Sequence, residues 1–168
     1  MKLGLGVGPT GAPGGERMID LAKEAENLGY DTIWCPEIYG MDCFTPLAWI
    51  GAHTTKINLG TSIMQISARS PASAAMHAVA MDFLSNGRLI LGIGVSGPQV
   101  VEGWYGQPWG KPYYRIKDYV SIMKKILRRE QPVIHEGKEI SLPYAGEGAM
   151  GVGKPLKSIL HMNPDIPI

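Results

Sequence analysis

Four short clusters of glycine and polar residues, each at the end of a predicted strand, hold the side chains best suited to bind a ligand. They are GVGP (6–9), WCPE (34–37), TSIM (61–64) and GVSGPQ (94–99). The carboxylate in the second cluster can exchange a proton, and the serines and glutamine can hydrogen-bond polar atoms of a ligand. Glycine allows sharp turns and a close approach of the backbone to another molecule. We therefore expect a small-molecule site built from strand ends.

Other kinds of chemistry have weaker support. Cys35 has no histidine near it in the sequence, which favours a small core residue over a nucleophile. The four histidines lack the spacing of a metal site. Gly92–Gly97 matches GxGxxG, but Pro98 follows directly and about 14 residues separate Gly97 from the next predicted helix. A phosphate-binding turn leads straight into a helix, so we do not expect a dinucleotide fold.

Composition narrows the class of protein. The chain has 168 residues, 45% hydrophobic and 18% charged, which fits one globular domain. A net charge of +1 gives no reason to expect nucleic acid or an anionic membrane as a partner. No run reaches the roughly 18 apolar residues that span a bilayer, and the N-terminus does not read as a signal peptide. Cys35 and Cys43 do not form a CxxC pair, so we expect thiols in a reducing cytoplasm.

The elements that must position the clusters alternate between strand and helix. Strands are predicted at 2–8, 31–35, 56–63 and 88–94, and helices lie between 15 and 29, at 44–53, from 71 to about 85, and beyond 111. This alternation predicts a parallel sheet with right-handed crossovers. Four such units fit either an open doubly wound sheet or half of a barrel.

Apolar periodicity predicts the buried face of each longer helix. The expected faces are Met18, Leu21, Ala22, Ala25 and Leu28; then Ala72, Ala75, Met76, Val79 and Phe83; then Ile116, Tyr119, Val120, Met123, Ile126 and Leu127. Between helices we expect a long loop at 95–111. After the last helix we expect a hairpin at 132–142 around Glu136-Gly137, a loop at 143–158 and the start of a further strand at 165–168.

Several stretches of the sequence resemble a known family, and this resemblance favours half of a barrel over an open doubly wound sheet. IWCPE (33–37), INLGTSI with ARSP (57–63, 68–71), LSNGRLILGIGVSGPQVVEGWYG (84–106) and Tyr114-Arg115 resemble, in this order, the luciferase-like oxidoreductases and especially their F420-dependent branch. The resemblance implies an α/β fold, a (β/α)8 TIM barrel with only about the first four β/α units present. Residues 1–168 would be a single domain, the N-terminal half of the barrel, with 131–165 inserted before strand five. Because such proteins are about twice as long, we expect a truncated form.

The resemblance also implies roles for residues at the strand ends. Glu37 would lie beside the deazaflavin ring as the catalytic acid or base, and Ser62 and Ile63 would support the ring through a cis peptide bond. The other residues expected to bind the coenzyme are Gly8, Val95, Ser96 and Gln99.

Three functions stay open at this point. The first is an F420-dependent oxidoreductase that transfers a hydride to or from a small organic substrate, and SGPQVVEGW (96–104) favours it. The second is an FMN-dependent monooxygenase of the same fold. The third is a non-catalytic half-barrel that assembles with itself or a partner. Ile38 and Gly97 stand where the sugar-phosphate dehydrogenases of the family have a catalytic histidine and acid, so that activity is doubtful.

Four strands of a barrel leave sheet edges and an inner face uncovered, which predicts a homo-oligomer. We expect size-exclusion chromatography with light scattering to give a mass of at least two chains. A stable monomer across a wide range of concentrations would contradict this.

Overall fold

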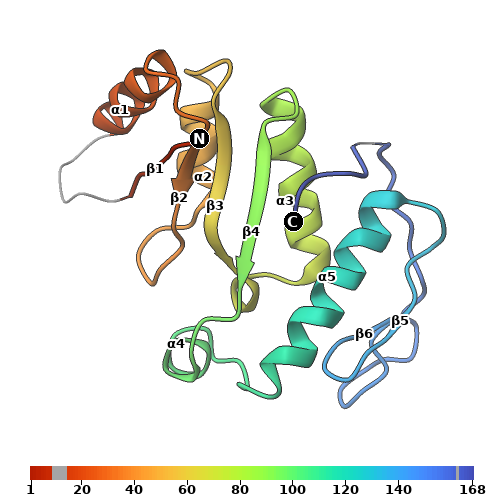
Figure 1. Cartoon of the computed structure of the whole chain (residues 1–168). Helices are drawn as coiled ribbons and strands as arrows, with labels where there is room; N and C mark the ends of the chain where they lie inside the picture. Colours follow the sequence, from red (N-terminus) through yellow and green to blue (C-terminus); the bar gives the residue numbers. More distant parts are fainter. Residues whose placement is uncertain (9–14, 162) are drawn as a thin grey trace. The chain divides into compact units, whose positions relative to one another are not determined.

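The computed structural model describes residues 1–8, 15–161 and 163–168. Strands and helices alternate along most of the chain (Figure 1), as the sequence predicts. The elements are β1 (Gly4–Gly6), α1 (Glu16–Asn27), β2 (Thr32–Cys35), α2 (Phe44–Gly51), β3 (Asn58–Gln65), the 3-10 turn η1 (Ile66–Ala68), α3 (Pro71–Leu84), β4 (Leu89–Gly94), α4 (Pro98–Gly103), α5 (Pro112–Arg128), β5 (His135–Glu136) and β6 (Ser141–Leu142).

Contacts divide the described residues into two compact units. The first consists of Met1–Gln65, His77–Gly94 and Ile166–Ile168, and the second of Ile66–Met76 and Val95–Asp165. The first unit holds the four-stranded sheet, and the second holds α4, α5 and the β5–β6 hairpin.

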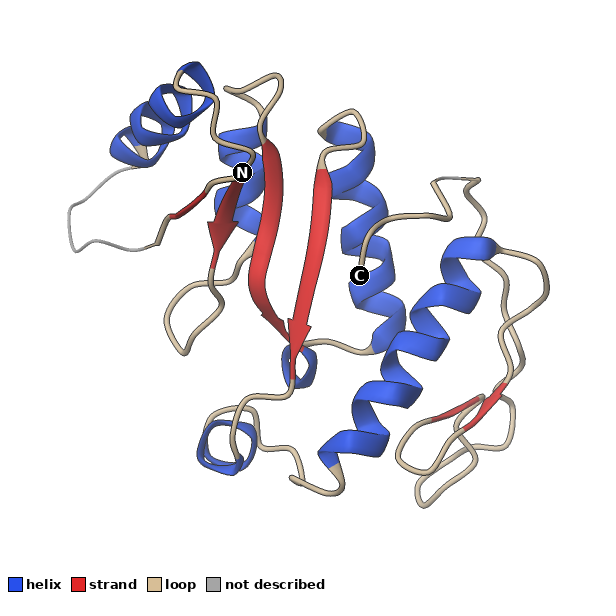
Figure 2. Ribbon diagram, viewed as in Figure 1, coloured by secondary structure: helices blue, strands red, loops and turns tan. Residues whose placement is uncertain are grey.

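The sheet of the first unit is parallel, with the strand order β1-β2-β3-β4 (Figure 2). Leu5 pairs with Ile33, Ile33 with Leu59, and Leu59 with Leu89. The predicted parallel sheet is confirmed, although β1 is shorter than the predicted strand at 2–8.

The two faces of this sheet differ because side chains alternate along a strand. One face carries apolar residues that are at most 1% exposed, and α2 packs against it at β2 and β3. They are Ile33, Cys35, Leu59, Leu89 and Leu91. The opposite face, called the open face below, carries Gly4, Gly6, Trp34, Gly60, Ile90 and Gly92.

The predicted buried faces of the helices are partly wrong. In α1 the buried residues are Ile19, Ala22 and Ala25, whereas Leu28 is 68% exposed. In α3, Ala74, Ala75, Ala78 and Met81 are buried, and the expected Met76 and Phe83 are exposed. The small alanine side chains let a helix backbone approach its neighbours closely, and this outweighs the larger apolar stripe that periodicity selects.

In the second unit, the buried apolar residues of α5 are Tyr119, Ile122, Met123 and Leu127. Tyr119, Met123 and Leu127 belong to the predicted face, and Ile122 does not. The predicted Ile116, Val120 and Ile126 are only partly buried. The Tyr119 hydroxyl donates to the carbonyl of Arg69 at 3.1 Å.

The hairpin after α5 is confirmed as the antiparallel pair β5–β6. It is fastened to α5 by Asp118, whose carboxylate accepts the amides of Glu139 and Ile140 at 2.8 and 3.1 Å and lies 3.2 Å from His135 Nε2. Burial alone would raise the pKa of Asp118, but these hydrogen bonds outweigh it and lower the pKa.

The expected long loop at 95–111 is wrong in part, because α4 begins directly after Gly97. Proline is favoured at the first position of a helix, where no N–H is needed, and Pro98 takes that position. The expectation that about 14 residues separate Gly97 from a helix is therefore also wrong. The helix has only six residues, so its end offers little of the dipole that a phosphate site uses.

The last residues return to the sheet. The Leu91 amide donates to the Pro167 carbonyl at 2.8 Å, and Ile166 is 5% exposed. No strand is assigned at 165–168, yet this bond places the segment along the outer edge of β4, where the predicted further strand would run.

Arg88 joins the start of β4 to the loop between α2 and β3. Its guanidinium donates to the carbonyls of Ile57 at 3.0 Å, Gly51 at 2.9 Å and Ser85 at 2.7 Å, and it also binds Thr54. The side chain is buried, which lowers the pKa of Arg88, although Glu26 partly offsets this. The fork of donors thus satisfies carbonyls that would otherwise lack a partner.

We expect Arg88→Met to lower the free energy of unfolding by about 3 kcal/mol, because several carbonyls lose their donor. The free energy of unfolding of Arg88→Lys should lie between those of Arg88→Met and the parent, since one ammonium cannot reach all of the carbonyls. Urea unfolding followed by circular dichroism measures this, and Arg17→Met, on the exposed side of α1, is the matched control. Equal stability of Arg88→Met and Arg17→Met would refute the role of Arg88.

Candidate functional site

The carboxyl ends of β2 and β3 are tied together by Glu37. This residue follows β2 by two positions, and its Oε2 accepts the backbone amide of Gln65, the last residue of β3, at 2.7 Å. Glu37 is partly exposed and Gln65 is buried. The carboxylate is therefore held at a fixed place on the edge of the sheet where the sequence predicts the site.

The third cluster forms an irregular step in β3. The peptide bond between Ser62 and Ile63 is cis, as the resemblance predicts, and the pairing of β3 with β4 shifts register between Thr61 and Met64. The Thr61 hydroxyl donates to the Gly92 carbonyl at 2.6 Å. Ser62 is exposed at this step.

Glycines of β4 make the step possible. A Cβ on Gly92 would lie 2.2 Å from the Thr61 carbonyl oxygen, and one on Gly94 would lie 2.8 Å from Cδ1 of Ile63. Both distances are shorter than real Cβ contacts, so the Ile63 side chain can rest over β4 only because Gly94 has none.

Gly8, the first-cluster residue expected to bind the coenzyme, lies beside the end of β2. A Cβ there would be 3.5 Å from Cγ of Pro36, an ordinary contact, so space alone does not require glycine. Pro9, from the same cluster, lies outside the described residues. The first unit thus brings Glu37, Ser62, Ile63 and Gly8 to the carboxyl edge of one sheet.

The fourth cluster belongs to the second unit and forms the turn before α4. Ser96 is exposed in a left-handed conformation with φ of 59°, and Gly97 follows as the N-cap of α4. The Gln99 side chain folds back, so that a Cβ on Gly97 would lie 2.8 Å from its Oε1. Val95 is partly buried, whereas Ser96 and Gln99 present polar groups at the surface of this unit.

Two features near the strand ends were not predicted from the sequence, and only one of them is marked in it. The Gln65 amide is a backbone donor, and every residue except proline has one, so nothing in the sequence marks it. The start of α4 is marked by Pro98 after a glycine, a pattern that favours a helix N-terminus and that could have revealed it.

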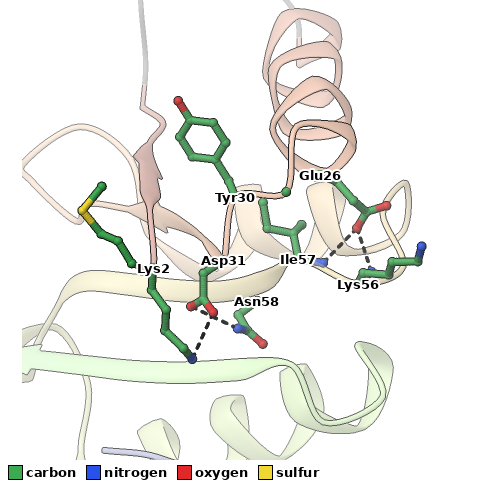
Figure 3. A pocket seen from close by; sticks show the side chains of 9 residues that line it. Lys2, Glu26, Tyr30, Asp31, Lys56, Ile57 and Asn58 are labelled. Atoms are coloured by element: carbon green, nitrogen blue, oxygen red, sulfur yellow. Dashed lines mark hydrogen bonds and ion pairs between the residues drawn. The ribbon is translucent and has the colours of Figure 1, made fainter.

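A cavity of about 340 Å³ lies at the opposite, amino edge of the sheet (Figure 3). Its two carboxylates are engaged: Lys2 Nζ lies 3.0 Å from Asp31 Oδ1, and Glu26 accepts the amides of Lys56 and Ile57 at 2.7 and 2.9 Å. Burial alone would raise the pKa of Glu26, but these amides lower it. We interpret this edge as structural, because its carboxylates are already engaged in holding the loop before β3 to α1.

Two further observations concern metals and membranes. The described residues hold no group of three or more histidine, cysteine, aspartate or glutamate side chains placed to bind a metal ion. Within the same part of the chain, no helix has the length and apolar character needed to cross a membrane.

Comparison with known proteins identifies the family. The sequence profile of the luciferase-like monooxygenases matches residues 3–159. The chain belongs to this family. Its parallel sheet is accordingly of the luciferase-like (β/α)8 barrel type. The described residues supply four strands of this sheet and do not close a barrel.

Individual relatives agree with this assignment. A Mycobacterium tuberculosis protein provisionally named a coenzyme F420-dependent oxidoreductase is 50% identical over the whole chain and 49% of its own length. The monooxygenase RslO1 of Streptomyces bottropensis has a TM-score of 0.78 at 22% identity, covering 96% of this chain and 50% of its own. The oxygenating constituent of 3,6-diketocamphane monooxygenase of Pseudomonas putida, solved with FMN, has a TM-score of 0.73 at 23% identity, covering 94% and 47%. The chain therefore spans about half the length of these proteins.

Cys35, beside the site, has the properties of a core residue. It is 1% exposed, and burial, together with the negative charges of Asp42 and Glu37, raises the pKa of its thiol to about 11. At neutral pH it is protonated and therefore a poor nucleophile.

We expect neither Cys35 nor the equally buried Cys43 to react with iodoacetamide at pH 8 in the folded protein, while both react in urea. Mass spectrometry of the labelled chain measures this. Because a thiolate is the reacting form and the pKa of Cys35 is raised, its labelling should increase only as the pH approaches 11. Rapid labelling of Cys35 at pH 8 without denaturant would show that it is an accessible thiolate.

Proposed function

We propose that this chain carries the coenzyme-ring side of an F420-dependent oxidoreductase that transfers a hydride between the deazaflavin and a small organic substrate. The observation that carries the proposal is the fixed carboxyl edge of the sheet, where the Glu37–Gln65 bond and the step at Ser62–Ile63 meet. The 50% identity to a protein provisionally named as F420-dependent supports deazaflavin as the coenzyme.

The residues at this edge fit a flat, mostly apolar ring. Gly6 on β1 faces unfilled space, since a Cβ there would meet nothing within 4 Å. Ile63 offers an apolar side chain held in place over Gly94, and the exposed Ser62 hydroxyl can hydrogen-bond a polar ring atom. Together they would hold one side of the ring and exclude water from it.

For the second unit by itself, we propose Val95, Ser96 and Gln99 as coenzyme-binding residues, as the resemblance implies. For the first unit we propose Gly8, where the end of β1 allows a close approach. The deazaflavin, when bound, supplies the carbon that gives or takes the hydride. The residues of the chain bind and orient it.

Glu37 is the proposed catalytic residue. Its Oε2 is held by the Gln65 amide, so the carboxylate stays at one place beside the ring, where it can take or return a substrate proton. The next residue, Ile38, is 59% exposed and cannot exchange protons, so Glu37 would act without a histidine neighbour. This argues against sugar-phosphate oxidation as the reaction.

An FMN-dependent monooxygenase is the second candidate, because a neighbour with a TM-score of 0.73 was solved with FMN. Its lower identity, 23% against 50%, makes it the weaker one. We also propose a reducing cytoplasm as the compartment, in view of the buried thiols. A second copy of the chain is the proposed partner, because four strands leave sheet edges unpaired.

Titration with F420 and with FMN, followed by absorbance, distinguishes these candidates. We expect F420 to bind at least roughly tenfold more tightly than FMN, about 1.4 kcal/mol. Selective FMN binding would overturn the proposed function in favour of the monooxygenase. Binding of neither would favour a non-catalytic half-barrel.

Variants of Glu37 test its place in the site. Glu37→Gln keeps an acceptor for the Gln65 amide and should bind F420 nearly as well as the parent. Glu37→Ala removes the carboxylate that accepts the Gln65 amide, which costs about 1–3 kcal/mol and should weaken binding roughly tenfold. Glu24→Ala, on the exposed side of α1, is the control. Unchanged binding by Glu37→Ala would remove Glu37 from the proposed site.

A further inference from the structure

The indole of Trp34 lies across the open face of the sheet, against the backbones of both neighbouring strands. A Cβ on Gly60 of β3 would lie 2.3 Å from Cε3 of the indole, and one on Gly4 of β1 would lie 2.4 Å from Nε1. Real Cβ atoms do not approach so closely, so glycine at both positions is what lets the ring lie flat. The indole thus covers the middle of the open face from β1 to β3.

The face beside the indole is open at Gly6. Gly6 pairs with Trp34 in register, and a Cβ there would meet nothing within 4 Å. Toward the carboxyl edge, the Thr61 carbonyl takes the place of a side chain at Gly92, and the Ile63 side chain takes that place at Gly94, so the open space ends there. A broad aromatic surface therefore lies directly below the strand ends where we place the coenzyme ring.

Packing between strands alone does not account for this arrangement. It explains glycine at positions 4 and 60, where the indole needs room. It does not require glycine at position 6, which is exposed on the edge strand β1 and where an alanine or valine would meet no steric barrier. The space is what a flat ring above the indole would require.

We propose that Trp34 is the floor of the coenzyme-ring pocket and a positioning residue, whose indole contacts the bound deazaflavin and sets how deeply it enters. This inference rests on the proposed function. Trp34 takes no part in proton or hydride transfer. Aromatic surfaces attract one another in offset-stacked and edge-to-face arrangements, which a deazaflavin and an indole can both form.

The test is a titration of the whole chain with F420, followed by the fluorescence of the coenzyme. An indole in contact with an excited flavin-type ring quenches it by electron donation. Trp34→Phe should therefore bind F420 roughly two- to tenfold more weakly and give a brighter coenzyme at saturation. A packing defect would weaken binding but would leave the brightness at saturation unchanged. Trp49→Phe is the matched control, because Trp49 is 52% exposed on α2, and it should match the parent in both measurements.

A second variant covers the case in which Trp34→Phe folds poorly. Gly6→Val adds a β-branched side chain to a strand position with open space, so the chain should keep its circular dichroism and unfolding midpoint. It should nevertheless weaken F420 binding roughly tenfold or more, because valine would occupy the space above the floor.

The two proposals fail in different ways. If the parent binds F420 and both variants bind it equally well with the same brightness, the role of Trp34 is overturned and the proposed function stands. If the parent itself does not bind F420, the proposed function fails and this inference fails with it.

Discussion

The irregular pairing of β3 with β4 is the constraint on which the candidate site depends. The register shift between Thr61 and Met64 turns the Thr61 carbonyl toward Gly92 and the Ile63 side chain toward Gly94. Neither contact leaves room for a Cβ on β4, and the Thr61 hydroxyl fixes the step through the Gly92 carbonyl. Gly92 of LGIG is therefore a steric requirement of the neighbouring backbone, and Gly94 lets the Ile63 side chain keep its place.

The same step brings the end of β3 to Glu37. A carboxylate that accepts a backbone amide is held more rigidly than one paired with a flexible lysine or arginine, because the amide is part of the sheet. The ends of β2, β3 and β4 are thus coupled by bonds that each involve the backbone of at least one strand. A binding site built on such elements holds its geometry better than one built on loops alone.

The strands and helices of the first unit could be predicted from the sequence, because they follow from local periodicity. Features that depend on contacts between distant residues could not. Alternating strand and helix patterns predict a parallel sheet. The nearly all-apolar strand four predicts cover on both faces, but only Leu89 and Leu91 are buried, whereas Ile90 on the open face is partly exposed. The cis bond at Ser62–Ile63 came from resemblance, since no local propensity marks it. Periodicity misplaced the outer helix faces, because alanines at 74, 75 and 78 permit a close approach that large side chains do not. The Glu37–Gln65 bond was not predictable, because it joins residues 28 apart through a backbone group.

The two edges of the sheet use similar residue types for different purposes. At the amino edge, Asp31 pairs with Lys2, and Glu26 accepts consecutive backbone amides. The Glu26 carboxylate therefore holds the loop before β3 in place. At the carboxyl edge, the Glu37 carboxylate binds the Gln65 amide near the exposed Ser62, and the face below is open at Gly6. Barrels of this kind place stability at the amino end of the strands and chemistry at the carboxyl end. The cavity at the amino edge is therefore a poor guide to the site, and the glycine-lined face beneath Glu37 and Ser62 is the better one.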